Sequence, residues 1–216
     1  MNIGVLASHR GTVLQAVLDA CTDRSLPAQV VVVVSNNSRS GAAERALQAG
    51  VPFCHLSGAS HPDPVALDAA IAGELITRRC DWVLLAGYMK KLGPVTLERF
   101  RGRILNTHPS LLPRHGGLGM YGERVHRAVL ESDDLVTGVT IHLVESEYDV
   151  GLILAQREIP VLSDDTLESL AARVHSVERV FVVETLLKIA TGQLASPPLA
   201  SGFDASAITR ESRGHG

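Results

Sequence analysis

The sequence predicts a Rossmann-like α/β fold, an open and mostly parallel sheet with helices on both faces, in a single domain. Short apolar runs alternate with segments of helical periodicity through the first half of the chain, which is the pattern of repeated β-α-β units. Val30–Val34 is an unbroken β-branched run, as expected for a strand buried on both faces of a parallel sheet. The length of 216 residues suits one such domain followed by a short tail.

Apolar runs and helical spacing locate the elements of the first half. Residues 11–21 place apolar side chains at helical spacing, and Gly50 is a typical stop for a helix over residues 42–49. The expected strands of this half are residues 3–7, 30–34, 53–56, 82–86 and 103–106, and the expected helices are residues 11–21, 42–49, 64–79 and 94–99.

The second half has a different pattern. Two strands are expected at residues 137–144 and 152–160, with only a polar turn around Asp149 between them, so they extend the sheet in antiparallel fashion. A helix is expected over residues 123–131, after a glycine-rich loop at 116–119 that we expect to be flexible.

The chain is expected to end in a long helix and a tail. Residues 164–166 supply N-cap candidates for a helix that runs to about Ala190 and stops at Gly192. The domain is therefore expected to span residues 1–194. Residues 195–216 are rich in Ser, Pro, Gly and Ala, and we expect this tail to be poorly ordered.

The composition argues against several classes of protein. The net charge is −3 and aromatic residues make up 4% of the chain, so we expect no nucleic-acid partner. Three cysteines without Cys-x-x-Cys spacing argue against a disulfide framework and against a structural zinc site. No signal peptide and no membrane-spanning run is evident, so we expect a cytoplasmic protein with reduced thiols, no bound metal and no membrane partner.

A polar strand end within residues 103–113 is the most informative segment for function. Asn106 and His108 lie two residues apart, so an extended backbone points both side chains to the same side. Pro109 holds His108 extended and prevents simple continuation into a helix. An amide donor and a titratable imidazole are thus expected where open α/β sheets bind ligands. Taken alone, the pair also fits a capping asparagine and an incidental surface histidine.

Three motifs together resemble the folate-dependent formyltransferases. Residues 106–113 read Asn-Thr-His-Pro-Ser-Leu-Leu-Pro, residues 138–142 read Gly-Val-Thr-Ile-His, and residues 149–156 read Asp-Val-Gly-Leu-Ile-Leu-Ala-Gln. They occur in the family's order, and the resemblance covers roughly residues 2–194. Each motif alone is a weak signal, whereas the set is specific. The resemblance implies transfer of a formyl group from 10-formyltetrahydrofolate, as co-substrate, to the amine of a small molecule.

The resemblance also implies the roles of four catalytic residues. Asn106 would donate an N–H group to the oxyanion of the tetrahedral intermediate, and His108 would carry a proton. Asp149 would favour the charged imidazole and raise its pKa, with His142 in a supporting role. The alternatives are a solvated acidic turn around Asp149 and a histidine at 142 that is satisfied within the core.

Two further sets of residues follow from the resemblance. The expected folate-binding residues are Met89, Lys90, Leu92, Glu145 and Asp149. The expected substrate-binding residues are Gly11, Thr12, Val13, Gly87, Pro109 and Glu178. Within the second set, the turn at residues 11–13 would hold a substrate phosphate at a helix N-terminus.

Two departures from the family pattern bear on the acceptor amine. Val13 stands where the family has an asparagine in its phosphate turn, and Arg179 stands where it usually has a histidine. The leading expectation is glycinamide ribonucleotide, a phosphorylated ribonucleotide of purine biosynthesis. The alternatives are another amine, such as an amino sugar, an amino acid or a natural-product precursor, and a non-catalytic ligand-binding relative. A homodimer is left open.

Overall fold

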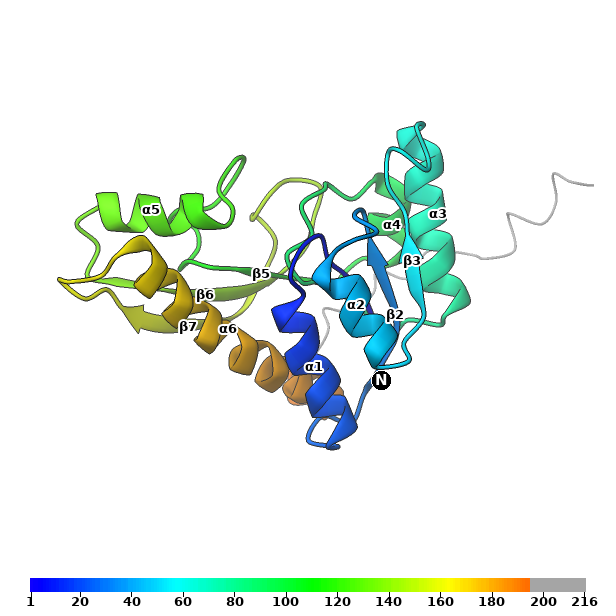
Figure 1. Ribbon diagram of the computed structural model, residues 1–216, viewed down its shortest axis with the longest axis horizontal. Coiled ribbons are helices and arrows are strands. Elements are labelled where there is room, and N and C mark those ends of the chain that lie inside the picture. Colours follow the sequence, from blue (N-terminus) through cyan, green and yellow to red (C-terminus); the bar gives the residue numbers. More distant parts are fainter. Residues whose placement is uncertain (195–216) are drawn as a thin grey trace, which may run out of the picture.

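The computed structural model describes residues 1–194, in which strands and helices follow the expected order (Figure 1). The expected tail at residues 195–216 lies outside the described residues. In chain order the elements are β1 Asn2–Leu6, α1 Thr12–Thr22, β2 Gln29–Ser35, α2 Gly41–Gln48, β3 Phe53–His55, α3 Pro64–Thr77, β4 Trp82–Leu85, α4 Pro94–Arg99, β5 Ile104–His108, α5 Glu123–Glu131, β6 Val136–Leu143, β7 Ile153–Pro160 and α6 Leu167–Ala190.

The strands of the described part form one seven-stranded sheet in the order β3-β2-β1-β4-β5-β6-β7. The first five strands pair in parallel, while β6 runs antiparallel to β5 and β7 runs antiparallel to β6. The predicted mostly parallel sheet with an antiparallel extension is therefore confirmed. The strand order reverses at β1 and β4, and the carboxyl ends of strands at such a point form the crevice in which open α/β sheets bind ligands.

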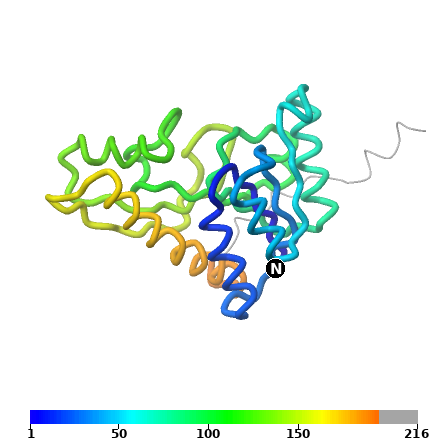
Figure 2. The backbone as a smooth tube through the Cα atoms, in the orientation of Figure 1, coloured from blue at the N-terminus to red at the C-terminus, as the bar shows by residue number. Residues whose placement is uncertain are grey.

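Helices cover both faces of the sheet. One apolar cluster joins the sheet to α1, α2, α5 and α6, and a second joins the opposite face to α3 and α4. The last helix passes beside the first, although they are far apart in the sequence (Figures 1 and 2). Strand β5 contributes to both clusters, because Leu105 belongs to the first and Ile104 to the second. This two-sided burial is what a strand in the middle of a covered sheet requires.

Strand β5 continues two residues beyond its expected end at Asn106 and ends at His108. The extension is supported by β6, which places His142 opposite Asn106 and Thr140 opposite His108. The expected strand end at Asn106 is therefore too early, because the ladder to β6 supplies backbone partners where the apolar side chains have already stopped. The two polar side chains lie inside a paired strand, and its geometry holds both on the same side.

In the described residues, none of the helices combines the length and apolarity needed to cross a bilayer. All three cysteines are free. Within residues 1–194, no group of three His, Cys, Asp or Glu side chains is arranged to hold a metal ion.

Asp68 is a buried carboxylate that ties α3 to the beginning of α4. It accepts hydrogen bonds from the Val95 N–H (2.7 Å), the Thr96 N–H (3.2 Å) and the Thr96 hydroxyl (2.5 Å). The N-cap of α4 is Gly93, which has no side chain to cap these N–H groups, so Asp68 supplies the acceptors from another helix.

We expect Asp68→Ala to lower the free energy of unfolding by about 3 kcal/mol, because buried N–H and hydroxyl groups lose their acceptor. Urea unfolding followed by circular dichroism measures the loss. The matched control is Asp133→Ala, which removes an exposed carboxylate and should change the stability by less than about 0.5 kcal/mol. Equal unfolding midpoints for Asp68→Ala and the wild type would show that the acceptor is dispensable.

Candidate active site

The four expected catalytic side chains meet beside the carboxyl end of β5. The Asn106 amide N–H donates to Nε2 of His142 on the neighbouring strand, at 3.1 Å. Asp149, from the turn between β6 and β7, brings one carboxylate oxygen to 3.5 Å from Nδ1 of His108 and the other to 3.5 Å from Nε2 of His142. The structure thus joins three motifs that lie up to 43 positions apart, from 106 to 149, in one cluster.

Backbone carbonyls determine where the protons of both imidazoles lie. Nε2 of His108 is 2.8 Å from the His115 carbonyl oxygen, and Nδ1 of His142 is 2.8 Å from the Leu143 carbonyl oxygen. Because a carbonyl oxygen only accepts, each of these nitrogens carries a proton. The other nitrogen of each ring faces Asp149, and in His108 this is Nδ1, the atom at which a proton is gained or lost.

Burial lowers the pKa of His108, although the Asp149 carboxylate and the His115 carbonyl act in the opposite direction. Asp149 favours the charged form and raises the pKa of this histidine, as the sequence predicts, but the loss of water around the ring outweighs this effect. His108 is 3% exposed, which is why desolvation dominates. The neutral imidazole is the resting form.

For Asp149, in contrast to His108, the interactions with neighbouring groups outweigh the effect of burial on the pKa. Burial raises the pKa of its carboxyl group, but the nearby rings of His142 and His108 and the N–H of Gly117 together bring the pKa below its ordinary value. The backbone of Asp149 has a φ of 56°, in the left-handed region that aspartate tolerates better than most residues. The resting site therefore pairs an ionised carboxylate with a neutral imidazole.

Close backbone packing explains two glycines of the motifs. A Cβ atom at Gly138 would collide with the Arg157 carbonyl oxygen and with the side chain of Leu111. A Cβ atom at Gly151 would collide with the Leu143 carbonyl oxygen. The second contact lies two residues from Asp149, so this glycine lets the turn approach β6 and brings the carboxylate to the two imidazoles.

A cavity of about 80 Å³ opens beside Asn106 and His142. Four of the five expected folate-binding residues line it, namely Lys90, Leu92, Glu145 and Asp149. Met89 is not part of this lining, and its backbone N–H donates to the Ser8 hydroxyl at 2.8 Å. The segment from Glu145 to Asp149 forms one wall, as expected, and the Lys90–Leu92 segment contributes to another.

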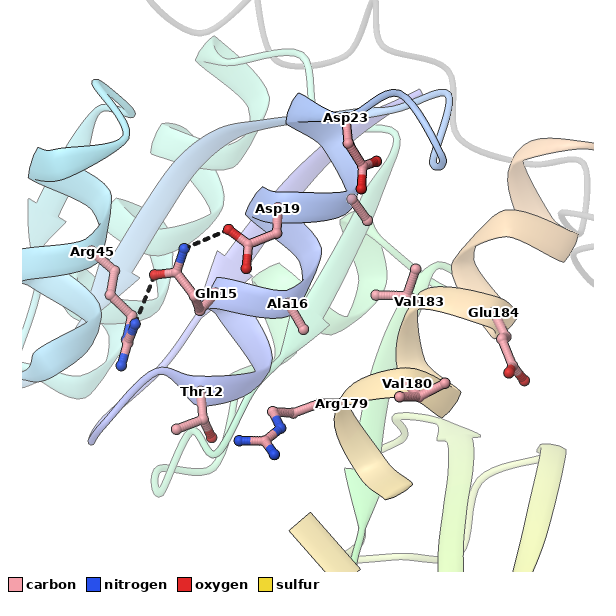
Figure 3. A pocket seen from close by; sticks show the side chains of 11 residues that line it. Thr12, Gln15, Ala16, Asp19, Asp23, Arg45, Arg179, Val180, Val183 and Glu184 are labelled. Carbon is pink, nitrogen blue, oxygen red and sulfur yellow. Dashed lines mark hydrogen bonds between the residues drawn. The ribbon is translucent and has the colours of Figure 1, made fainter. Parts of the chain in front are cut away.

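A larger cavity of about 570 Å³ runs along α1 from Thr12 to Asp23 and is also lined by Arg45 of α2 and by residues 179–184 of α6 (Figure 3). Gly11, the N-cap, has a φ of 67° and makes no side-chain cap, so the first N–H groups of the helix keep their hydrogen-bonding capacity. Thr12 lines this cavity together with Arg179, whose side chain reaches from α6 toward it (Figure 3). Val13 is 6% exposed and its side chain packs in the core, so only its backbone N–H is left for the expected role in phosphate binding.

The other expected substrate-binding residues occupy three places. Gly87 follows β4, and its carbonyl accepts the Ser8 N–H at 3.2 Å, which ties together the loops after β4 and β1. Pro109 directly follows β5 and is half-buried. Glu178 is buried on α6, where one oxygen accepts the Thr107 hydroxyl (2.8 Å) and the other lies 3.2 Å from Nδ1 of His175.

Sequence reasoning missed His115, Gly117 and Thr107. The loop at 116–119 was expected to be flexible because of its glycines, yet the Gly117 N–H donates to Asp149, and the carbonyl of His115 just before it accepts from His108. These are backbone contacts, and neither periodicity nor motif spacing reveals them. The one available signal was His115 itself, a titratable residue close to the Asn-x-His-Pro segment.

The chain matches the model of the family described as Formyl transferase over residues 1–186. It is 42% identical over 188 residues to the phosphoribosylglycinamide formyltransferase of Mycobacterium tuberculosis, covering 87% of this chain and 84% of that protein. The corresponding protein of Escherichia coli is 35% identical over 94% of both chains. Glycinamide ribonucleotide transformylase 1 from Symbiobacterium toebii has a crystal structure with a TM-score of 0.84 and 41% identity, covering 90% of each chain.

Some relatives are much longer than this chain. It spans 14% of the trifunctional purine biosynthetic protein adenosine-3 of Chironomus tentans and 63% of the chloroplastic phosphoribosylglycinamide formyltransferase of Arabidopsis thaliana. The family match nevertheless covers all three motifs and every element through β7, as well as most of α6. On this coverage, and with the site assembled as its motifs require, the chain belongs to the formyl transferase family.

Proposed function

We propose that this chain transfers the formyl group of 10-formyltetrahydrofolate to the amine of glycinamide ribonucleotide in purine biosynthesis. The observation that carries the proposal is the meeting of Asn106, His108 and Asp149 at the ligand-binding edge of the sheet, in a member of the formyl transferase family. Relatives that bear the name phosphoribosylglycinamide formyltransferase at similar length support this acceptor. We expect a cytoplasmic enzyme of small-molecule substrates that binds no nucleic acid.

The first step is attack of the neutral amine on the formyl carbon. A carbon–nitrogen bond forms, and the carbonyl electron pair moves to oxygen as an oxyanion. Asn106 uses one amide N–H on His142 and keeps a second N–H for that oxygen. His142, held through Nδ1 by the Leu143 carbonyl, orients this amide.

The second step moves one proton from the attacking amine to the leaving nitrogen. His108 rests neutral with Nδ1 unprotonated, so this atom accepts the proton of the attacking amine. The resulting imidazolium lies beside the ionised Asp149, which stabilises it. His108 then gives the proton to the folate nitrogen as the old carbon–nitrogen bond breaks, which returns the ring to its neutral form.

The N-terminus of α1 is the candidate anion-binding part of the site. It offers N–H groups without a side-chain cap, Thr12 adds a hydroxyl, and Arg179 places a positive charge beside Thr12 in the same cavity, which also carries the carboxylates of Asp19, Asp23 and Glu184 (Figure 3). Arg179 has no hydrogen bond or ion pair within the described residues. A second candidate, transfer to another phosphorylated or anionic amine, is favoured by the same Arg179 together with the loss of a polar side chain at Val13.

The test is an assay of the wild-type protein with 10-formyltetrahydrofolate and a panel of amines that includes glycinamide ribonucleotide. Deformylation of the folate is followed by absorbance, and the formylated product by mass spectrometry. We expect rapid transfer to glycinamide ribonucleotide. If a different amine is formylated rapidly and glycinamide ribonucleotide is not formylated, the proposed acceptor is wrong, but the proposed formyl transfer stands. Failure to use any amine in a broad panel would reject the formyl transfer.

Thr12→Pro is expected to weaken binding of glycinamide ribonucleotide by at least about tenfold, while folate binding changes little. Proline removes the N–H of the first helical residue and the hydroxyl that face the cavity, so the phosphate loses two donors. Calorimetric titration with each ligand measures both affinities. Thr12→Ser keeps both donors and serves as the matched control. Equal losses for the two ligands would place the nucleotide elsewhere.

A further inference from the structure

We propose that Asp134 is a positioning residue for the transfer reaction, acting through His115 on the segment of residues 114–117 that hydrogen-bonds both His108 and Asp149. This inference rests on the proposed function for its kinetic consequence, but its structural part concerns the protein without substrate. Asp134 lies between α5 and β6, outside all three motifs.

Asp134 anchors two neighbouring side chains of the segment. One carboxylate oxygen is 2.7 Å from Nε2 of His115, and the other pairs with the guanidinium of Arg114. The Asp134 side chain is 10% exposed and that of His115 is 17% exposed, so the contact between them is largely shielded from water. A shielded hydrogen bond to a charged acceptor is stronger than an exposed one, and it holds the loop at a defined distance from β6.

The anchored segment contacts both members of the catalytic pair. The His115 carbonyl accepts the Nε2–H of His108 at 2.8 Å, and the Gly117 N–H donates to an Asp149 oxygen at 2.9 Å. The backbone of His115 is in the left-handed region, with a φ of 52°. A residue other than glycine is costly in that region, so the conformation needs support from its surroundings, and the bond to Asp134 provides it.

The consequence is control over which nitrogen of His108 carries the proton. A neutral imidazole has two tautomers, and only the Nε2–H form satisfies the His115 carbonyl while leaving Nδ1 free toward Asp149. If the segment of residues 114–117 shifts, the His115 carbonyl no longer selects the Nε2–H tautomer. Some His108 rings then carry the proton on Nδ1, and in those rings Nδ1 cannot accept a proton from the amine.

The first measurement uses the unliganded protein. ¹⁵N NMR of the imidazole rings distinguishes the two tautomers of His108, whose signals are assigned by comparison with His108→Gln. We expect one protonated Nε2 and one unprotonated Nδ1 in the wild type, and averaged shifts in Asp134→Ala. The matched control, Asp133→Ala, removes the adjacent exposed carboxylate and should leave the His108 signals unchanged.

The second measurement is steady-state kinetics. We expect Asp134→Ala to lower kcat by up to about 100-fold through misplacement of the catalytic groups, with the KM for folate within about twofold of wild type. Asp134→Asn keeps an oxygen for His115 and should recover part of both the kcat and the tautomer preference. This variant also answers the question if Asp134→Ala does not fold.

Each outcome decides the proposal. Wild-type His108 signals in a folded Asp134→Ala protein, or in Asp134→Asn if that is the only folded variant, together with a wild-type kcat, would overturn it. A changed kcat with unchanged ring signals would also overturn it, because the effect would then not pass through His108. If the wild type formylates no amine, the proposed function fails, whereas the ring spectra still decide the role of Asp134.

Discussion

Asp149→Asn is expected to lower kcat by about 10²- to 10⁴-fold while the protein remains folded. The carboxylate lies 3.5 Å from Nδ1 of His108 and 3.5 Å from Nε2 of His142, and it is ionised at rest because the Gly117 N–H and the neighbouring rings lower its pKa. The amide has the same shape and no charge. It cannot stabilise the imidazolium that forms when His108 takes up a proton, so the transition state loses its main electrostatic support.

The pH profile of the same variant gives an independent check. In the proposed mechanism, activity requires the neutral form of His108, so we expect the rate to fall as the pH drops through the pKa of this ring, which burial has lowered below its ordinary value. Asp149 counteracts that lowering, so its removal moves the acidic limb of the kcat profile to lower pH. Asp133→Asn is the control for charge alone and should match the wild type in rate and profile. A wild-type rate in Asp149→Asn would reject the mechanism.

Gly151→Ala is expected to lower kcat by about 100-fold and the free energy of unfolding by about 1–3 kcal/mol. An added Cβ atom collides with the Leu143 carbonyl oxygen, which belongs to a neighbouring backbone and cannot rotate away. The collision occurs at the point where the Leu143 N–H donates to the Leu152 carbonyl, at 2.9 Å. Relief therefore requires the turn to move outward, and Asp149 moves with it, away from the two imidazoles.

Gly73→Ala is the matched control for this substitution. Gly73 lies in α3, and a Cβ atom there meets nothing within 4 Å. Alanine at that position should leave kcat unchanged and raise the free energy of unfolding by roughly 0.5–1 kcal/mol, because glycine is the poorer helix former. Thermal unfolding and steady-state kinetics on both variants measure the contrast. Wild-type kinetics in Gly151→Ala would show that the turn tolerates the displacement.

The sequence by itself determined the architecture and the candidate reacting groups. Alternation of apolar runs with helical periodicity predicts the β-α-β half, because each pattern is set by which residues a strand or helix buries. The β-branched run at 30–34 predicts a strand covered on both faces, which the structure confirms. The order and spacing of the motifs indicated the formyltransferase family. The structure brings Asn106, His108, His142 and Asp149 together.

Only the tertiary structure decided the pKa values and the contacts of those groups. The pKa of His108 depends on how much water the packed sheet leaves around the ring, and a local motif contains no information about that. The sequence therefore predicts the contribution of Asp149 but not the larger effect of burial. Val13 looks like a lost ligand in the sequence, but the register of α1 turns its side chain into the core. Glycines 116–119 predict a flexible loop, yet the hydrogen bonds of Gly117 and the neighbouring His115 attach it to the site.

The sequence predicts some features and not others because the underlying interactions differ in how far apart in the chain their residues lie. Periodicity, propensity and motif spacing act between residues that are close in the chain, so they predict strands, helices and the order of polar residues. Desolvation, tautomer selection and the close approach of two backbones depend on residues brought together from distant positions, such as Asp134 with His115 or Gly151 with Leu143. Those contacts exist only once the sheet has assembled, and they are what makes the strand end an active site.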